Sequence, residues 1–156
     1  MSSSESKMDF FEVGDKTSLI CTDPTVGETV RASLRELGFK FHTAETSEIA
    51  IERTRYNQYD IIIIQENFAG SSLKSNAVLS YLASLPMASR RNSMVVLIGS
   101  SLKTLDAMQA FAYSVQLVTN TTDLPNFTAI LKKSWAEFQS LYKVFKDVLA
   151  SLSEKS

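Results

Sequence analysis

Gln65 occupies the place where the chemistry of this chain is expected. It follows the isoleucine run Ile61–Ile64, which is apolar on both faces and predicts a central buried strand of a parallel sheet. In open α/β sheets, ligands bind in the crevice at the carboxyl ends of the central strands. A glutamine amide carries no charge, is not a nucleophile and is a poor ligand for a hard cation. This strand end therefore offers little catalytic chemistry.

Two neighbouring segments could supply chemistry in place of Gln65. Glu66 is a carboxylate, but the alternation of side chains along a strand directs it away from Gln65. Gly99–Ser101 follows a second apolar run and could hold an anion at a helix N-terminus. It lacks the lysine and the glycine spacing of a phosphate loop, so a capped helix start is the favoured interpretation.

The single cysteine and the single histidine are also candidates. Cys21 ends an apolar segment, where a lone cysteine is more often a small buried hydrophobe than a redox sensor. His42 alternates with two phenylalanines and is interpreted as a surface or half-buried histidine rather than a pH switch. No nucleophile–base pair and no pair of carboxylates can be placed together, so the sequence predicts no enzyme and no cofactor.

Strand and helix patterns alternate along the chain and predict the element order βα repeated five times. The strands are expected at 18–21, 39–44, 61–64, 94–98 and 115–118, and the helices at 24–37, 47–56, 73–85, 102–113 and 125–152. Right-handed crossovers turn this order into a five-stranded parallel sheet with helices on both faces and the flavodoxin-like strand order 2-1-3-4-5. The fold class is therefore α/β.

Length and composition limit the remaining possibilities. The 156 residues predict one domain, with a loose tail at 1–16, the α/β domain at 17–125, a final helix at 126–152 and a short tail at 153–156. The net charge of −1 gives no reason to expect nucleic acid as a partner. No apolar run is long enough for a membrane span and no signal sequence is seen, so a cytoplasmic protein without membrane association is expected.

The chain resembles the receiver domain of bacterial two-component response regulators over about residues 17–134. The resemblance depends on the element order and on four local matches, at Leu19–Pro24, Leu37–Phe39, Ala44–Ala50 and Tyr59–Asp60. In that family a carboxylate after the third strand accepts a phosphoryl group, and an acidic pair after the first strand holds Mg²⁺. A Thr or Ser ends the fourth strand, a Lys ends the fifth, and an aromatic residue on the fifth strand acts as a switch.

Aligned on this resemblance, the functional positions of the family carry other residues here: Gln65 for the acceptor, Cys21 and Thr22 for the acidic pair, Gly99 for the hydroxyl, Asn120 for the lysine and Leu117 for the switch. A shift of one residue would leave Asp23 as one surviving acid. The resemblance therefore implies a degenerate receiver that is not phosphorylated and acts as an interaction module with a signalling partner that the sequence does not name. The alternative is a flavodoxin-like binder of a small ligand or cofactor in the emptied crevice, although the hydroxyl-rich loop expected for a flavin is absent after the first strand.

The final helix suggests a partner. No Gly or Pro interrupts the chain after Asn126, and a helix to Leu152 would be about 40 Å long, which exceeds the sheet. Its apolar residues alternate by four and three, as in a heptad seam, at Leu131, Trp135, Phe138, Tyr142, Phe145, Leu149 and Leu152, and Leu141 and Val148 widen this stripe. Residues from Phe138 onward are expected to lie beyond the sheet. We therefore expect a homodimer through this helix; folding back onto the domain or onto Phe10 and Phe11 is the alternative.

Overall fold

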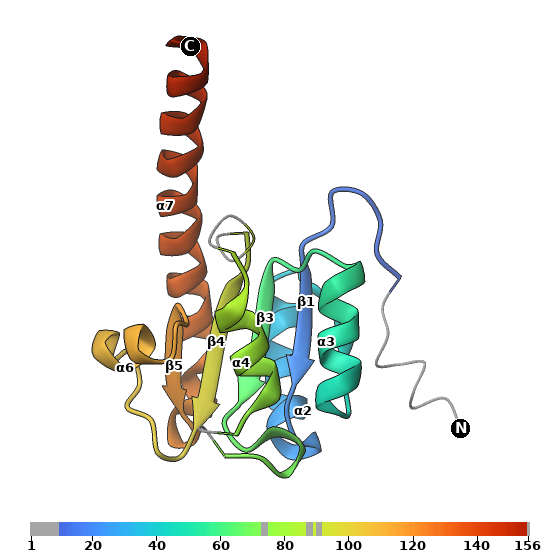
Figure 1. Ribbon diagram of the computed structural model, residues 1–156. Helices are drawn as coiled ribbons and strands as arrows, with labels where there is room; N and C mark the ends of the chain where they lie inside the picture. Colours follow the sequence, from blue (N-terminus) through green and yellow to red (C-terminus); the bar gives the residue numbers. More distant parts are fainter. Residues whose placement is uncertain (1–9, 73–74, 87–88, 90–91, 156) are drawn as a thin grey trace.

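A five-stranded parallel sheet with the order β2-β1-β3-β4-β5 forms the centre of the protein (Figure 1). The structure, a computed structural model, describes residues 10–72, 75–86, 89 and 92–155. The strands are β1 Thr17–Cys21, β2 Lys40–Thr43, β3 Ile61–Gln65, β4 Met94–Gly99 and β5 Leu117–Asn120. The predicted fold class and strand order are confirmed.

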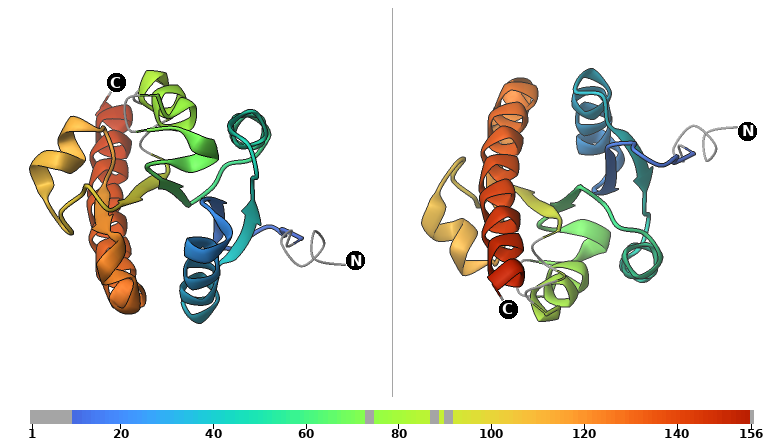
Figure 2. Two further views of the ribbon diagram at one scale, coloured as in Figure 1. Left: turned by 90° about the horizontal axis from the view of Figure 1, so that it is seen from below. Right: turned by 90° about the horizontal axis from the view of Figure 1, so that it is seen from above.

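The helices form one layer on each face of this sheet (Figure 2). They are α2 Pro24–Glu36, α3 Ser47–Tyr56, α4 Ala77–Ser84, α6 Ala107–Ala112 and α7 Phe127–Lys155, with 3₁₀ turns η1 at Phe68–Gly70 and η2 at Thr121–Asn126. α2 and α7 cover one face, and α3, α4 and α6 contribute to the core on the other. The sheet is therefore buried on both sides.

Strand β3 shows why its sequence has no polar face. Ile61 and Ile63 pack in the core under α2 and α7, whereas Ile62 and Ile64 pack in the core under α3 and α4. Each isoleucine buried in this way contributes about 1.5–3 kcal/mol. A polar residue at any of the four positions would have to enter one of the two cores.

Helices α4 and α6 are shorter than the sequence predicted. The side chain of Asn76 caps α4 by accepting from the backbone N–H of Leu79 at 3.1 Å, so this helix begins at Ala77; the predicted start at residues 73–74 lies outside the described residues. Helix α6 begins at Ala107 rather than Leu102, because Asp106 caps it after Leu105, whose φ of 64° interrupts a right-handed helix.

Strand β5 begins later than the predicted Val115. The backbone N–H of Val115 donates to the carbonyl of Ala110 at 2.9 Å and so closes the end of α6, after Ser114 turns the chain with a φ of 58°. The strand ladder starts only at Leu117, opposite Val96. Val115 is nevertheless buried, which explains why the apolar pattern pointed to it.

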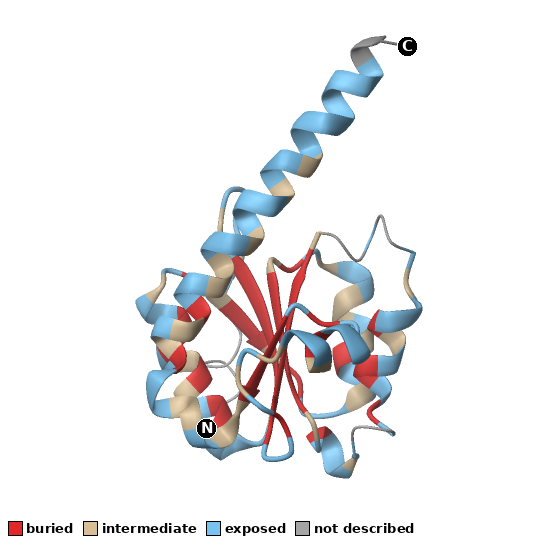
Figure 3. Ribbon diagram, turned by 90° about the vertical axis from the view of Figure 1, so that its left-hand side faces the viewer, coloured by how far each residue is buried: buried red, intermediate tan, exposed pale blue. Residues whose placement is uncertain are grey.

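Helix α7 extends far beyond the sheet (Figures 1 and 3). Its 29 residues span about 44 Å, whereas the six residues of β4 span about 20 Å. It begins after η2, which contains Pro125, and continues past the predicted end at Leu152 to Lys155. Because α7 runs antiparallel to the strands, its second half projects past their amino ends, at the opposite pole from the crevice.

The segment before β1 folds back against the domain through one aromatic residue. Phe11 stacks on His42 with ring centroids 3.9 Å apart, and His42 Nδ1 is hydrogen-bonded to the Tyr59 hydroxyl at 2.7 Å. Burial raises the pKa of Tyr59, so the phenol stays protonated. Phe10 remains exposed, and residues 1–9 of the predicted tail lie outside the described residues. His42, which was predicted to be at the surface or half-buried, is buried, because Phe11 covers it.

Candidate functional site

Gln65 and Asp23 join the carboxyl ends of β3 and β1. The Gln65 side-chain Nε2 donates to Asp23 Oδ2 at 2.9 Å, and the backbone N–H of Asp23 donates to Gln65 Oε1 at 2.7 Å. Gln65 is only 6% exposed. One amide therefore satisfies both its donor and its acceptor on a single neighbouring residue.

The second carboxylate oxygen of Asp23 is also engaged. Oδ1 accepts from the backbone N–H of Val26 at 2.8 Å and caps α2, in front of Pro24 at the first helical position. Each carboxylate oxygen of Asp23 thus has an internal hydrogen bond. Its carboxylate serves the helix start and the Gln65 amide.

The two residues aligned with the acidic pair do not face the crevice as charges. Cys21 is fully buried, and burial raises the pKa of its thiol far above the usual range, so it stays protonated. The Thr22 hydroxyl donates to the carbonyl of Asp23 at 2.9 Å. Cys21 is therefore a small core residue, the interpretation that its apolar surroundings favoured.

Glu66 lies against the end of β4. Its carboxylate accepts hydrogen bonds from the backbone N–H of Ser101 at 3.1 Å, from the Ser100 hydroxyl at 3.4 Å and from the Ser101 hydroxyl. The backbone N–H of Glu66 donates to the carbonyl of Ile98 at 2.8 Å. The side chains of Gln65 and Glu66 therefore diverge, one toward β1 and the other toward β4.

Asn120 is used for structure at the end of β5. Its Nδ2 donates to the carbonyls of Leu102 at 2.6 Å and Ser100 at 3.3 Å, and its Oδ1 accepts from the backbone N–H and the hydroxyl of Thr122. Asn120 thus holds the β4–α6 connection against β5. Leu117 is buried in the core under α2 and α7, so nothing at this position can swing between buried and exposed states as an aromatic switch would.

A hollow of about 470 Å³ remains beside these ties, at the carboxyl ends of β1 and β2. Its lining includes Thr22, Asp23, Arg31, Glu45 and Asn67, together with apolar residues of η1. Among the described residues, no group of three or more His, Cys, Asp or Glu side chains is placed to hold a metal ion. The hollow is polar and of mixed charge.

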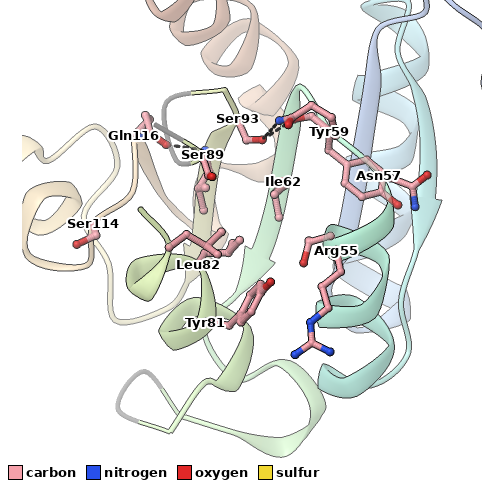
Figure 4. Close-up of a pocket in the computed structure, with 14 residues that line it drawn as sticks. Arg55, Asn57, Tyr59, Ile62, Tyr81, Leu82, Ser89, Ser93, Ser114 and Gln116 are labelled. Carbon is pink, nitrogen blue, oxygen red and sulfur yellow. Dashed lines mark hydrogen bonds between the residues drawn. The ribbon is translucent and has the colours of Figure 1, made fainter. Parts of the chain in front are cut away.

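A second cavity, of about 310 Å³, lies between α3, α4 and the amino-terminal half of the sheet (Figure 4). Two of its polar side chains are hydrogen-bonded to other residues of the lining: Ser93 Oγ donates to the carbonyl of Tyr59 at 2.5 Å, and Gln116 Oε1 accepts from the backbone N–H of Val95 at 2.7 Å. The Arg55 guanidinium lies 5.8 Å from the centre of the Tyr81 ring. These groups stabilise the cavity wall.

The apolar residues predicted on the final helix divide into two groups. Leu131 is fully buried in the core, Trp135 packs edge-on against Phe39 at 5.3 Å, and Phe138 stacks on Trp135 at 5.8 Å. Phe138 was expected to lie beyond the sheet, but it packs partly against the core under α2 and α7, because Trp135 extends this core outward. The Tyr142 hydroxyl donates to Oδ1 of Asn92, which lies two residues before β4.

Several apolar residues in the second half of α7 are exposed. Leu141 is 71% exposed, Val148 52% and Leu152 58%, and Val144 and Leu149 are also exposed. Phe145 is half-buried and lines an apolar groove with Phe138, Leu141, Tyr142 and Gln116. No helix in the described part of the chain is long and apolar enough to cross a membrane.

Sequence reasoning missed the roles of Glu66, Ser101 and Asn76. Asn76 caps α4 and also donates to the carbonyls of Gln65 and Glu66 at 3.1 and 3.3 Å, so it fixes the chain after β3. A signal for Glu66 was available: Gly99 is the only position of β4 without a side chain, and it lies next to Glu66 in the folded sheet. The register of β3 against β4 was needed to see it.

Comparison with solved structures identifies the fold. A two-component response regulator from Cytophaga hutchinsonii is similar with a TM-score of 0.64 at 19% identity, over 81% of this chain and 97% of that chain. A response regulator receiver domain from Methylobacillus flagellatus has a TM-score of 0.58 at 21% identity, over 78% and 99%. The signal receiver domain of a histidine kinase from Syntrophus aciditrophicus has a TM-score of 0.61 at 17% identity, over 78% and 91%.

No protein-family model and no curated protein sequence matches this chain. The likeness to the solved structures thus concerns the fold, which is that of a receiver domain. Their names come from two-component signalling, in agreement with the family that the sequence resembles.

Proposed function

We propose that this protein is a non-phosphorylatable receiver-like module that acts by protein–protein interaction in cytoplasmic bacterial signal transduction. The observation that carries the proposal is the Gln65–Asp23 pair, in which an amide at the acceptor position is hydrogen-bonded to the carboxylate of Asp23. An amide cannot form an acyl phosphate, and a single capped carboxylate is a weak site for Mg²⁺.

The remaining positions support the same proposal. Asn120 carries no charge to pair with a phosphoryl group, and its side chain is already bonded to the β4–α6 connection. The output of such a module then depends on a surface that is always presented or that a partner controls. Without a phosphorylation site, the exposed surfaces are the regions through which the module would bind a partner.

The test of this proposal is treatment with acetyl phosphate and Mg²⁺, followed by mass spectrometry of the intact protein. The expected result is no addition of one phosphoryl group, while a phosphorylatable receiver in the same mixture is modified. A stoichiometric adduct on this chain would overturn the proposal. If one formed, its loss in Glu66→Ala would identify the acceptor as the neighbouring carboxylate.

The second half of α7 is the proposed interaction surface, and a second copy of this chain is the proposed occupant. Leu131 and Trp135 already serve the chain's own core, which removes them from the predicted seam. The residues left with exposed surface alternate by three and four at Phe138, Leu141, Phe145, Val148 and Leu152. Two α7 helices packed along this stripe would cover apolar surface that monomers of soluble proteins rarely expose.

The shape of the stripe favours packing of α7 against α7 of the second copy. It is wider than a two-stranded seam, because Val144 and Leu149 flank it, so a bundle that also contacts the partner's domain fits it better than a simple coiled coil. Exposed apolar residues lie along the projecting half of α7, whereas the groove lined by Phe138, Leu141 and Phe145 lies at its base. An antiparallel pair would place each helix tip near that groove of the partner.

Light scattering at micromolar concentration tests the dimer. The wild-type protein is expected to be a dimer, and the double variant Leu141→Glu/Val148→Glu a monomer, since two carboxylates would enter the apolar stripe. Ala150→Glu is the matched control, because Ala150 is exposed on the opposite side of α7. A monomeric wild type, or a dimer that survives the double substitution, would contradict the proposed surface.

A ligand-binding function is the second candidate, and the hollow of about 470 Å³ near Asp23 and Arg31 is the observation that favours it. A bound flavin or similar cofactor would give an absorbance band in the visible region. An absorbance scan of the freshly purified protein, followed by mass spectrometry of its denatured supernatant, separates the two functions.

A further inference from the structure

The turn after β4 has the features of an oxyanion-binding site. The backbone N–H of Ser101 and the hydroxyls of Ser100 and Ser101 converge on one point, and the carboxylate of Glu66 lies at that point. Three donors directed at a carboxylate form charge-assisted hydrogen bonds, the stronger kind in proteins. The turn is not the start of α6, which begins at Ala107, so the sequence-based interpretation of a capped helix start is wrong here.

Gly99 makes room for this carboxylate. A Cβ atom at Gly99 would lie 2.3 Å from both Cδ and Oε1 of Glu66, far inside the contact distance. Every other residue of β4 carries a buried side chain, so the bare position and the carboxylate belong together. The glutamate side chain could swing away from a larger residue, but only by leaving all three donors.

We infer that Gly99–Ser101 is an oxyanion-binding turn whose occupant is the Glu66 carboxylate of the same chain. The tethered carboxylate excludes free oxyanions such as inorganic phosphate, and it fastens the β4–α6 connection to the end of β3. A free oxyanion enters only when Glu66 leaves or is removed. This inference is independent of the α7 interface and of whether the chain forms a dimer.

The test uses Glu66→Ala in the full chain and inorganic phosphate as the probe. In ¹⁵N spectra, phosphate is expected to produce saturable shifts centred on the Ser100 and Ser101 amides in this variant, and none in the wild type. Glu52→Ala is the matched control, because it removes the same charge from an exposed position on α3. Adding Ser101→Ala to Glu66→Ala is expected to weaken phosphate binding about tenfold.

A second measurement applies even if the alanine variant folds poorly. Gly99→Ala is expected to lower the folding equilibrium constant about tenfold in the wild type, and by less than about threefold in a Glu66→Gln background, where the carboxylate contacts are already weakened. An equal decrease of the folding equilibrium constant in both backgrounds would contradict the proposed contact between Glu66 and the Gly99–Ser101 turn. Saturable phosphate binding by the wild type at the same turn, or none by a folded Glu66→Ala variant, would overturn the oxyanion site.

Discussion

The two poles of this molecule differ in how their functional groups are satisfied. At the carboxyl ends of the strands, the side chains of Gln65, Glu66 and Asn120 are all bonded to neighbouring parts of the chain. At the opposite pole, α7 projects with Leu141, Val148 and Leu152 largely exposed. The three crevice side chains are thus hydrogen-bonded within the chain, whereas the projecting helix presents exposed apolar surface.

This contrast separates two kinds of contact. Hydrogen bonds within the crevice are short-range and directional, so they tie particular strand ends to each other. Apolar surface has no directional requirement and can be covered by any complementary partner. We therefore expect substitutions in the crevice to affect folding, and substitutions on the projecting helix to affect association.

The largest effect is expected where α7 still belongs to the core. Leu131→Ala should lower the free energy of unfolding by about 2–5 kcal/mol, because it leaves a cavity at a fully buried position. Leu152→Ala should change it by less than about 0.5 kcal/mol at a protein concentration where the chain is monomeric. Urea denaturation followed by far-UV circular dichroism measures both. Similar losses in the two variants would mean that the projecting half is also part of the monomer's fold.

A smaller effect is expected at the Gln65–Asp23 pair. Gln65→Ala removes two hydrogen bonds and should lower the free energy of unfolding by about 1–2 kcal/mol, with water able to reach the exposed Asp23. Urea midpoints at constant slope give the value. A neutral result would show that the crevice is not stabilised by this pair.

The isosteric variant Gln65→Glu adds a pH dependence with a definite sign. It places a carboxyl group about 3 Å from that of Asp23, and this nearby negative charge together with burial raises the folded-state pKa of the introduced carboxyl above its unfolded-state value. The destabilisation should therefore be full at pH 7 and should shrink as the pH falls through this raised pKa. Denaturation at about pH 7 and about pH 5 tests this, with Gln65→Ala as the variant without such a dependence.

The fold was predictable from the sequence because the apolar residues of the strands indicate which strands are buried. Ile61–Ile64 required cover on both faces, and Asp23 followed by Pro24 identified the start of α2. Helix lengths were harder, since the short α4 and α6 depend on Asn76 and Asp106, whose capping hydrogen bonds are not distinguishable in sequence from those of other polar residues. The occupant of the Gly99–Ser101 turn was missed because it comes from a different strand.

The same reasoning explains the partial result on α7. A pattern of apolar residues reports which side of a helix is buried, but not what buries it. Trp135 and Tyr142 were predicted to face a partner, yet they contact Phe39 and Asn92 of the same domain. The domain's own contacts therefore shift the available stripe from Tyr142, which is hydrogen-bonded to Asn92, toward the exposed Leu141.

The smallest expected signal is one of dynamics. In the receiver family that the sequence resembles, a hydroxyl residue on the fourth strand and an aromatic residue on the fifth change conformation together. This chain has Gly99 and the buried Leu117 at these positions. Relaxation-dispersion measurements should therefore detect no μs–ms exchange in the β4–α6 connection or in β5. Residues 141–152 of α7, in contrast, should show exchange that grows as the protein is diluted toward its dissociation constant, because the dimer then coexists with the monomer. Widespread exchange around α6 and β5 that is independent of protein concentration would contradict this prediction. It would show that the crevice interconverts between two conformations, so that both poles would be dynamic.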